Sequence, residues 1–193
     1  MATLKRKIPK KIKKTYKIDN VTYESKALYD FHVECERAYR RGLISSFEIP
    51  KNMGKKSRYT TYKPVIDKIK FDSMMEARYY LKLLKDKADG IIEDFKLQYP
   101  FCLQPKFKKN GKTFRGIEYV CDFFIYINKD DREVIDIKGK ETVEFKIKRK
   151  LFEYKYPELS LKVIQYYEPS DEWLDLDEIK KLIRKKKKEG ADS

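Results

Sequence analysis

Residues 117–138 read IEYVCDFFIYINKDDREVIDIK, and the fold that we expect follows mainly from this segment. Two segments rich in Ile, Val, Phe and Tyr, 117–127 and 133–138, are separated by the polar segment Asn128–Arg132. Runs rich in Val, Ile, Tyr and Phe and bounded by Asn and Asp are typical of strands joined by a turn. The stretch therefore predicts a hairpin, in which residues of the first strand lie beside residues of the second.

Near its end the second strand carries Asp136 and Lys138, two positions apart, so their side chains point to one face. Ile135 and Ile137 then point to the opposite, buried face. Asp122 lies in the middle of the otherwise apolar first strand, where a carboxylate is costly to bury unless it is paired or bound to metal. In a hairpin Asp122 can lie close to Asp136, and a divalent cation offsets the repulsion between two carboxylates.

This pattern suggests metal-dependent chemistry. Mg²⁺ prefers a few carboxylates plus water, and it activates one water molecule as a nucleophile. Lys138 beside the ion would orient that water and stabilise charge on a phosphate oxygen. Simpler interpretations stay open, because Asp136 and Lys138 could form an ion pair on an edge strand, and Asp122 could accept backbone N–H bonds at a strand end.

Residues 21–50 resemble residues 69–98 at a constant offset of 48 positions. Each copy has a serine at a helix start, an amphipathic segment, a glycine at its end and then an apolar strand-forming segment. Only four of the 30 aligned positions are identical. We interpret the similarity as a degenerate repeat.

Glu76 is the next candidate ligand. Ser73-Met74-Met75-Glu76 is also a capping-box pattern, which gives the glutamate a purely structural alternative. The first copy keeps the serine as Ser25 but has Leu28 at the glutamate position. A helix of this kind can therefore start without the glutamate, which favours a role at or beside the metal. Gln98 is a further candidate, although an ordinary core or surface amide is the favoured interpretation.

The remaining elements complete an α/β pattern. We expect helices near 73–88, 141–156 and 174–188, strands near 91–103 and 159–166, and a lysine-rich hairpin at 104–116. The helix at 141–156, which Pro157 ends, joins two strands as a crossover, and this favours a parallel pair within a mixed sheet. The chain then divides into a basic arm at 1–20, the degenerate helix–strand copy at 21–50, a linker at 51–68, a core at 69–167 and a C-terminal basic helix at 168–193.

The chain has 46 Lys and Arg against 31 Asp and Glu, a formal net charge of +15 over 193 residues. Of the positive charges, 20 lie in three segments that contain no acid, namely Met1–Lys17, Gln104–Arg115 and Lys180–Lys188. The net charge of the rest of the chain is therefore −5. This clustering favours a nucleic acid as partner over solubilising tails. It does not favour a membrane, because the tails lack an opposing face of Trp or Leu. The expected contacts are Lys106, Lys108, Lys109, Lys112, Arg115 and Lys140.

Several classes of protein are excluded by residue content. Cys35, Cys102 and Cys121 are widely spaced, which indicates reduced thiols in a cytosol-like compartment rather than a disulfide framework or zinc site. His32 is the only histidine, so the chain has no His-rich zinc site, HNH-type nuclease site or two-histidine ribonuclease site. The chain has no Gly-rich phosphate loop or nucleophile elbow. The basic N-terminus is not followed by the apolar segment of a secretory signal, and no apolar run is long enough to span a bilayer.

Three short motifs occur in an order that resembles the PD-(D/E)XK nuclease superfamily. They are Ser73-x-x-Glu76, Asp122-Phe123 and Asp136-Ile137-Lys138-Gly139. The likeness is strongest to phage endonuclease I and related junction-resolving enzymes, and it extends over about 68–167, including a helix–Pro-Glu-Leu–strand segment. Two departures are Cys121, where the superfamily's eponymous proline would stand, and Asp136, where endonuclease I has glutamate.

The resemblance implies a restriction-endonuclease-like fold and hydrolysis of DNA phosphodiester bonds with Mg²⁺ or Mn²⁺. In this family Glu76, Asp122, Asp136 and the backbone carbonyl of Ile137 would hold the metal, and Lys138 would be catalytic. The implied substrate is branched DNA such as a Holliday junction. The implied assembly is a homodimer, in the cytoplasm of a bacterial host if the chain is phage-encoded.

Two other functions stay open from the sequence. One is a sequence-specific or end-processing nuclease of the same fold. The other is a non-catalytic nucleic-acid-binding or packaging protein whose acidic residues are structural.

Overall fold

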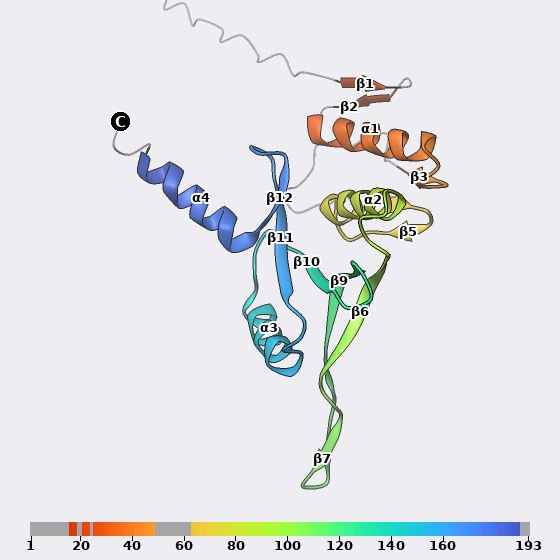
Figure 1. The fold of residues 1–193 in the computed structure, drawn as a ribbon. Coiled ribbons are helices and arrows are strands. Elements are labelled where there is room, and N and C mark those ends of the chain that lie inside the picture. Colours follow the sequence, from red (N-terminus) through yellow and green to blue (C-terminus); the bar gives the residue numbers. More distant parts are fainter. Residues whose placement is uncertain (1–15, 19–20, 24, 49–62, 190–193) are drawn as a thin grey trace, which may run out of the picture. The chain divides into compact units, whose positions relative to one another are not determined.

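The computed structural model describes residues 16–18, 21–23, 25–48 and 63–189. The chain divides into two compact units, Met1–Met74 and Met75–Ser193. Most of the expected basic arm, much of the expected linker and the last four residues of the chain lie outside the described residues. Figure 1 labels the helices and strands in chain order.

The described residues of the first unit form short strands and one helix. Strands β1 (Tyr16–Ile18) and β2 (Val21–Tyr23) form an antiparallel hairpin, and helix α1 spans Lys26–Arg40. Strands β3 (Phe47–Glu48), β4 (Val65–Ile66) and β5 (Ile69–Lys70) form a small antiparallel sheet in that order. The end of the expected arm and the end of the expected linker are therefore strands, because each pairs with an apolar neighbour.

The buried residues of α1 follow helical spacing, as an amphipathic helix requires. They are Leu28, Phe31, His32, Cys35 and Ala38. The single histidine forms a 2.5 Å hydrogen bond between His32 Nδ1 and Tyr23 Oη. It is thus part of the packing of the first unit.

The repeat is also visible in the fold. Helix α2 spans Met74–Ala88, so α1 and α2 have equal lengths and start 48 residues apart. Gly42 and Gly90, which follow the two helices, have φ of +69° and +74°, the left-handed region that suits glycine at a helix end. Each helix also follows a short hairpin. One detail differs from expectation, because the side chain of Ser25 makes no capping hydrogen bond.

The second unit contains a five-stranded mixed sheet in the order β12-β11-β10-β9-β6. Its strands are β6 (Asp94–Gln104), β9 (Ile117–Tyr126), β10 (Arg132–Ile137), β11 (Leu161–Tyr167) and β12 (Glu172–Asp175). Strands β10 and β11 are parallel and the other neighbours are antiparallel. Helix α3 (Val143–Lys155) is the crossover between the parallel strands, so the expected mixed α/β sheet is confirmed.

Strand β12 is an element that we did not expect. Residues 174–175 were assigned to the closing helix, but they pair with Gln165 and Ile164 of β11. Helix α4 therefore starts later and spans Leu176–Glu189. None of the described helices is long and apolar enough to cross a membrane.

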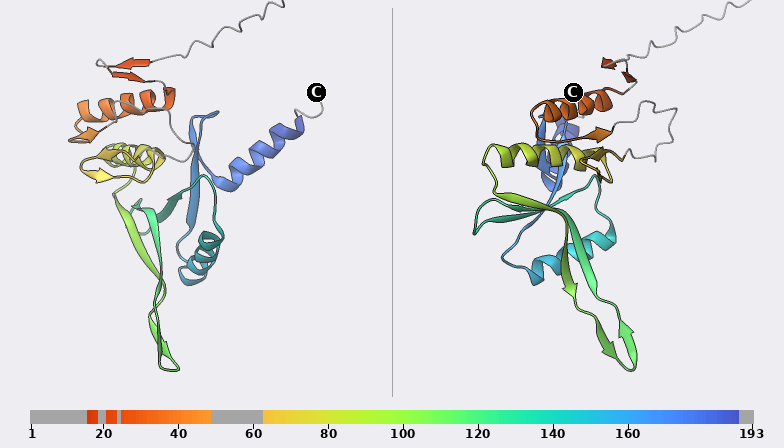
Figure 2. Two further views of the ribbon diagram at one scale, coloured as in Figure 1. Left: turned by 180° about the vertical axis from the view of Figure 1, so that it is seen from behind. Right: turned by 90° about the vertical axis from the view of Figure 1, so that its right-hand side faces the viewer.

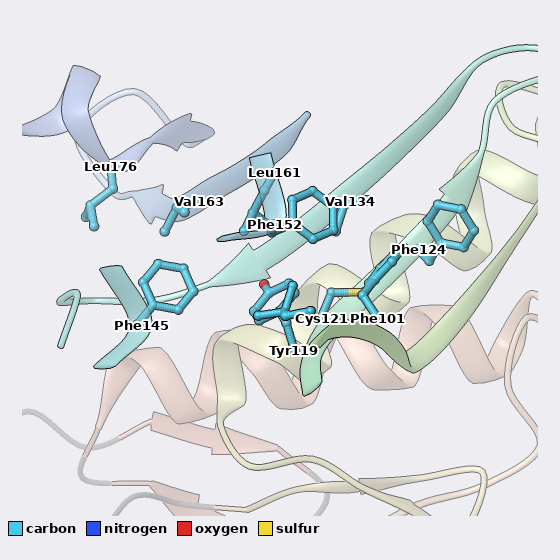
Figure 3. Close-up of a cluster of buried hydrophobic side chains, with 11 residues drawn as sticks. Phe101, Tyr119, Cys121, Phe124, Val134, Phe145, Phe152, Leu161, Val163 and Leu176 are labelled. Atoms are coloured by element: carbon cyan, nitrogen blue, oxygen red, sulfur yellow. The ribbon is translucent and has the colours of Figure 1, made fainter. Parts of the chain in front are cut away.

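Side chains from α3 and one face of the sheet form the main core, drawn in Figure 3. Its members are Phe101, Leu103, Tyr119, Cys121, Phe124, Val134, Phe145, Phe152, Leu161, Val163 and Leu176. Phe152 is completely buried, and full burial of such a side chain stabilises a fold by roughly 1.5–3 kcal/mol. Helix α3 begins where the side chain of Thr142 accepts a hydrogen bond from the Phe145 N–H.

Helix α2 packs against the sheet through other residues. Tyr79 contacts Phe123 and Trp173, with ring centroids 5.1 Å and 4.9 Å apart. Phe123 of β9 therefore faces α2, whereas its neighbour Phe124 faces α3. Because both faces of the sheet are covered, Asp122 in β9 is partly buried and Asp136, near the end of β10, is almost fully buried.

Beyond the sheet, β6 and β9 continue as a two-stranded ribbon, whose tip projects away from the helices of this unit in both views of Figure 2. The tip is a hairpin of β7 (Phe107–Lys109) and β8 (Lys112–Phe114). Its two turn residues, Asn110 and Gly111, have φ of 49° and 73°, as the favoured two-residue hairpin turn requires. The expected lysine-rich hairpin is confirmed.

Candidate active site

Asp122 and Asp136 lie where two neighbouring strands stop pairing. The β9–β10 ladder runs to the pair Phe123 and Ile135, and the next positions in the same register are Asp122 and Asp136. At that point the Asp122 side chain takes the place of a backbone acceptor, because its Oδ2 accepts a hydrogen bond from the Ile137 N–H at 2.7 Å. The hairpin therefore brings the two carboxylates together, as predicted.

Asp136 is almost fully buried, with 1% of its surface exposed. Its Oδ2 accepts a 2.6 Å hydrogen bond from the Tyr119 hydroxyl, and its Oδ1 forms an ion pair with Lys138 Nζ. Both Asp136 and its neighbour Ile135 are buried, so β10 has no open face at this position. The alternative of an edge-strand ion pair is wrong, because β10 lies between β9 and β11.

Lys138 connects this buried carboxylate to the surface. Its Nζ lies 4.7 Å from the centre of the Phe145 ring of α3, and 30% of its side chain is exposed. An ammonium group held by a carboxylate and an aromatic face is restricted in position. It remains accessible to an anion from solvent.

Burial is the largest cause that raises the pKa of Asp122, to about 7. The charges of Asp136 and Glu76 raise it further, while the Ile137 N–H and Lys138 act in the opposite direction. The carboxyl group is thus held close to its titration point at neutral pH. Such a site favours an added positive charge, since a cation would relieve the repulsion between the acids.

The neighbouring groups respond to the same environment. Burial, and then the charge of Asp136, raises the pKa of Tyr119 far above its ordinary value. Burial also raises the pKa of the Cys121 thiol to about 12. Tyr119 therefore acts as a hydrogen-bond donor to Asp136, and Cys121 is an uncharged core residue. All three cysteines are free thiols.

Gln98 reaches the site in an uncommon backbone conformation. Its φ is +48°, which is rare for residues other than glycine and often marks a functional position. It lies between the paired residues Leu97 and Tyr99 of β6. Its Nε2 donates to Asp122 Oδ1 over 3.3 Å. Both oxygens of Asp122 thus have protein hydrogen bonds, including the backbone N–H bond that the simpler interpretation foresaw.

Glu76 lies in the first turn of α2 and acts on the site through its charge, which raises the pKa of Asp122. Within the described part of the chain, no group of three His, Cys, Asp or Glu side chains gathers closely enough to hold a metal ion. Asp122 and Asp136 are therefore the central acidic pair, and Glu76 contributes from farther away. Sequence reasoning missed Tyr119, because its hydroxyl meets Asp136 only through the pairing of β9 with β10.

The predicted nucleic-acid contacts are all exposed. Lys106, Lys108, Lys109, Lys112 and Arg115 lie on or beside the β7–β8 hairpin, and Lys140 follows β10 in the loop before α3. No acid lies among the five hairpin cations. The hairpin is thus a strongly positive surface carried by two of the strands that also build the site.

Comparison with known proteins places the chain in a family without assigning an activity. No curated protein and no solved structure gives a significant match. One family profile matches residues 56–168, more than half of the chain, and this range contains all the candidate site residues described above. The chain belongs to the family described as "Protein of unknown function (DUF1064)".

Proposed function

We propose that the protein is a divalent-metal-dependent endodeoxyribonuclease of the PD-(D/E)XK type, with a restriction-endonuclease-like fold. One observation carries the proposal: Asp122 and Asp136 meet where β9 and β10 separate, with Lys138 paired to the buried acid. The raised pKa of Asp122 supports it, because a purely structural carboxylate would normally be stabilised in its charged form. The mixed sheet of the second unit is compatible with the fold that the motifs imply.

The donor atoms fit a hard cation. Mg²⁺ and Mn²⁺ take carboxylate and carbonyl oxygens, and the two acids are near enough for their charges to interact strongly. Asp122, Asp136 and the Ile137 carbonyl would hold the ion, and Glu76 would add negative charge. When bound, such an ion would neutralise negative charge on the phosphate and would lower the pKa of the water molecule attached to it.

The protein's own residues prepare the site. The Tyr119 hydroxyl orients the Asp136 carboxylate, and Gln98 together with the Ile137 N–H orients Asp122. Lys138 presents a partly exposed ammonium group in a fixed position. A donor placed in this way stabilises negative charge that develops on a phosphate oxygen during cleavage.

The substrate that fits best is DNA, and specifically branched DNA cut by a homodimer in the cytoplasm. The net charge of +15 and the exposed hairpin cations support a polyanionic partner. The preference for branches rests on the likeness of the motifs to phage junction-resolving enzymes.

The test is a cleavage assay on a four-way junction, a flap and a linear duplex, with Mg²⁺, Mn²⁺ or EDTA. We expect metal-dependent nicks, which Asp136→Asn reduces to background while DNA binding persists. Asp130→Asn, in the exposed turn between β9 and β10, is the matched control and should cut normally. Activity of Asp136→Asn within a few-fold of the unchanged protein would reject the site.

A second candidate is a non-catalytic DNA-binding protein. It is favoured by one observation, namely that every oxygen of Asp122 and Asp136 already has a partner within the protein. Such a protein would bind all three DNAs without cutting any of them in either metal. A sequence-specific or end-processing nuclease would instead cut the linear duplex as well as the junction.

A further inference from the structure

The tip hairpin has two chemically different faces. The antiparallel register pairs Phe107 with Phe114, Lys108 with Thr113 and Lys109 with Lys112. Because directly opposed residues share a face and successive residues alternate, one face carries both phenylalanines together with Lys109 and Lys112. The other face carries Lys108 and Thr113.

The two phenylalanine rings are stacked and exposed. Their centroids lie 4.7 Å apart with planes only 5° from parallel, and 40% of Phe107 and 44% of Phe114 remain exposed. The two rings shield each other on one side only, so each offers an outer surface to a partner. A tight Asn110-Gly111 turn closes the hairpin beyond them and holds the pair in register.

The charge around the rings identifies the kind of partner. Residues 104–115 contain five cations and no acid. This charge favours a polyanion as the partner over a basic or neutral protein surface. Aromatic rings beside lysines are the combination by which proteins hold single-stranded nucleic acids, since bases stack on the rings and phosphates meet the cations. The bases of a continuous duplex are already stacked on each other and offer no face to such a ring.

We propose that the Phe107/Phe114 face of this hairpin stacks on unpaired bases of DNA, while Lys109 and Lys112 contact the flanking phosphates. The hairpin then selects DNA with an interrupted base stack, such as a gap or a branch, over continuous duplex. This inference deepens the proposed function and rests on its choice of DNA as partner, but it needs no cleavage.

Binding of the full chain is measured in EDTA by fluorescence anisotropy, on a duplex with a short single-stranded gap and on a continuous duplex of equal length. A 2-aminopurine base in the gap reports stacking by a fall in its emission. Loss of one base–aromatic stack weakens binding roughly 5- to 150-fold. Phe107→Ala with Phe114→Ala should cause such a loss on gapped DNA, abolish the emission change and leave the continuous duplex within about twofold.

Three controls sharpen the result. Tyr154→Ala removes another exposed aromatic side chain, 87% exposed on α3, and should leave both affinities unchanged. Phe107→Leu with Phe114→Leu keeps apolar bulk at the tip and should show the same selective loss as the alanine pair. Melting curves confirm that each variant is folded.

The lysines are tested by salt dependence. Each phosphate contact contributes about −0.9 to the slope of log K against log salt on duplex DNA and about −0.7 on single strands. Lys109→Ala with Lys112→Ala should make the slope on gapped DNA shallower by about 1.4–1.8. Lys129→Ala, an exposed lysine in the turn between β9 and β10, is the control and should leave the slope unchanged.

Equal affinity of the phenylalanine variants and the unchanged protein for gapped DNA would overturn the inference. So would an equal loss on both DNAs, or failure of the unchanged protein to bind DNA at low salt. The proposed function fails separately, since a protein that binds gapped DNA selectively but never cuts with Mg²⁺ or Mn²⁺ would keep the hairpin inference and lose the nuclease.

Discussion

At the scale of single residues, Asp122 links function to stability. Its pKa of about 7 lies above its ordinary value of 3.8, so the folded protein holds a proton that the unfolded chain has released. Stability should therefore fall as pH rises from about 4 to about 7, and stay low above that range. The acidic pair thus costs the metal-free protein stability at neutral pH.

Asp122→Asn should remove this cost, because the amide is neutral and its oxygen still accepts from the Ile137 N–H. In EDTA at pH 8 we expect the variant to melt above the unchanged protein, by about 2–4 °C for each kcal/mol regained. The gain should shrink toward pH 4. Melting followed by circular dichroism at both pH values checks this, and a variant that melts lower at pH 8 would contradict it.

Lys138 should matter for rate more than for affinity. Lys138→Ala should lower single-turnover cleavage about 10²- to 10³-fold, the usual effect of losing one positioned donor to transition-state charge. Lys140→Ala, two residues away and exposed, is the matched comparison and should weaken DNA binding with little effect on rate. A Lys138 variant with weaker binding and a normal single-turnover rate would instead make this residue a phosphate contact.

At the scale of elements, the tip hairpin is joined to the sheet by a tight approach of two backbones. The β6–β9 ladder ends at Gln104 and Ile117, and the β7–β8 ladder starts at Phe107 and Phe114. Between them, a Cβ added to Gly116 would lie 3.0 Å from the Gln104 carbonyl oxygen. The joint therefore depends on the missing side chain of one glycine.

Gly116→Ala should shift the tip relative to the sheet and weaken DNA binding, while the melting temperature changes little, because the main core is on the other side of the joint. Gly139→Ala is the control, since a Cβ there meets no atom within 4 Å. Anisotropy with gapped DNA and a melting curve test the pair. Unchanged binding by Gly116→Ala would show that the tip adjusts to the added methyl group.

At the scale of the whole molecule, a junction-resolving activity needs two sites on one substrate. We therefore expect a C2 homodimer that makes paired, symmetric nicks in a four-way junction. Light scattering of the free protein and of its junction complex in EDTA measures the assembly, and a sequencing gel locates the nicks. A monomer in both states that cuts linear duplex and junction equally would refute the junction-resolving assignment, while leaving the metal-dependent nuclease standing.

Much of the secondary structure, and the closeness of Asp122 to Asp136, could be predicted from the amino-acid sequence. Alternating and apolar runs defined β9, β10 and β11, and Pro157 marked the end of α3, because these signals depend only on near neighbours in the chain. The 48-residue repeat was also correct for both helices. The closeness of Asp122 to Asp136 could also be predicted, because the short turn between β9 and β10 fixes which residues of the two strands are paired.

The burial of the acidic pair and the side chains that hold it could not be predicted from the sequence. Strand β12 was missed because Leu174 and Asp175, assigned from the sequence to the closing helix, pair with Gln165 and Ile164 across the short turn between β11 and β12. The hydrogen bond from Tyr119 to Asp136 depends on the pairing of β9 with β10 in the sheet. The position of Gln98 beside Asp122, with its left-handed backbone conformation, depends on the pairing of β6 with β9. Local periodicity shows which residues share a face, but the burial of that face depends on helices from elsewhere in the chain. Asp136 is 1% exposed in the folded unit, and no neighbour in its own strand could have indicated this.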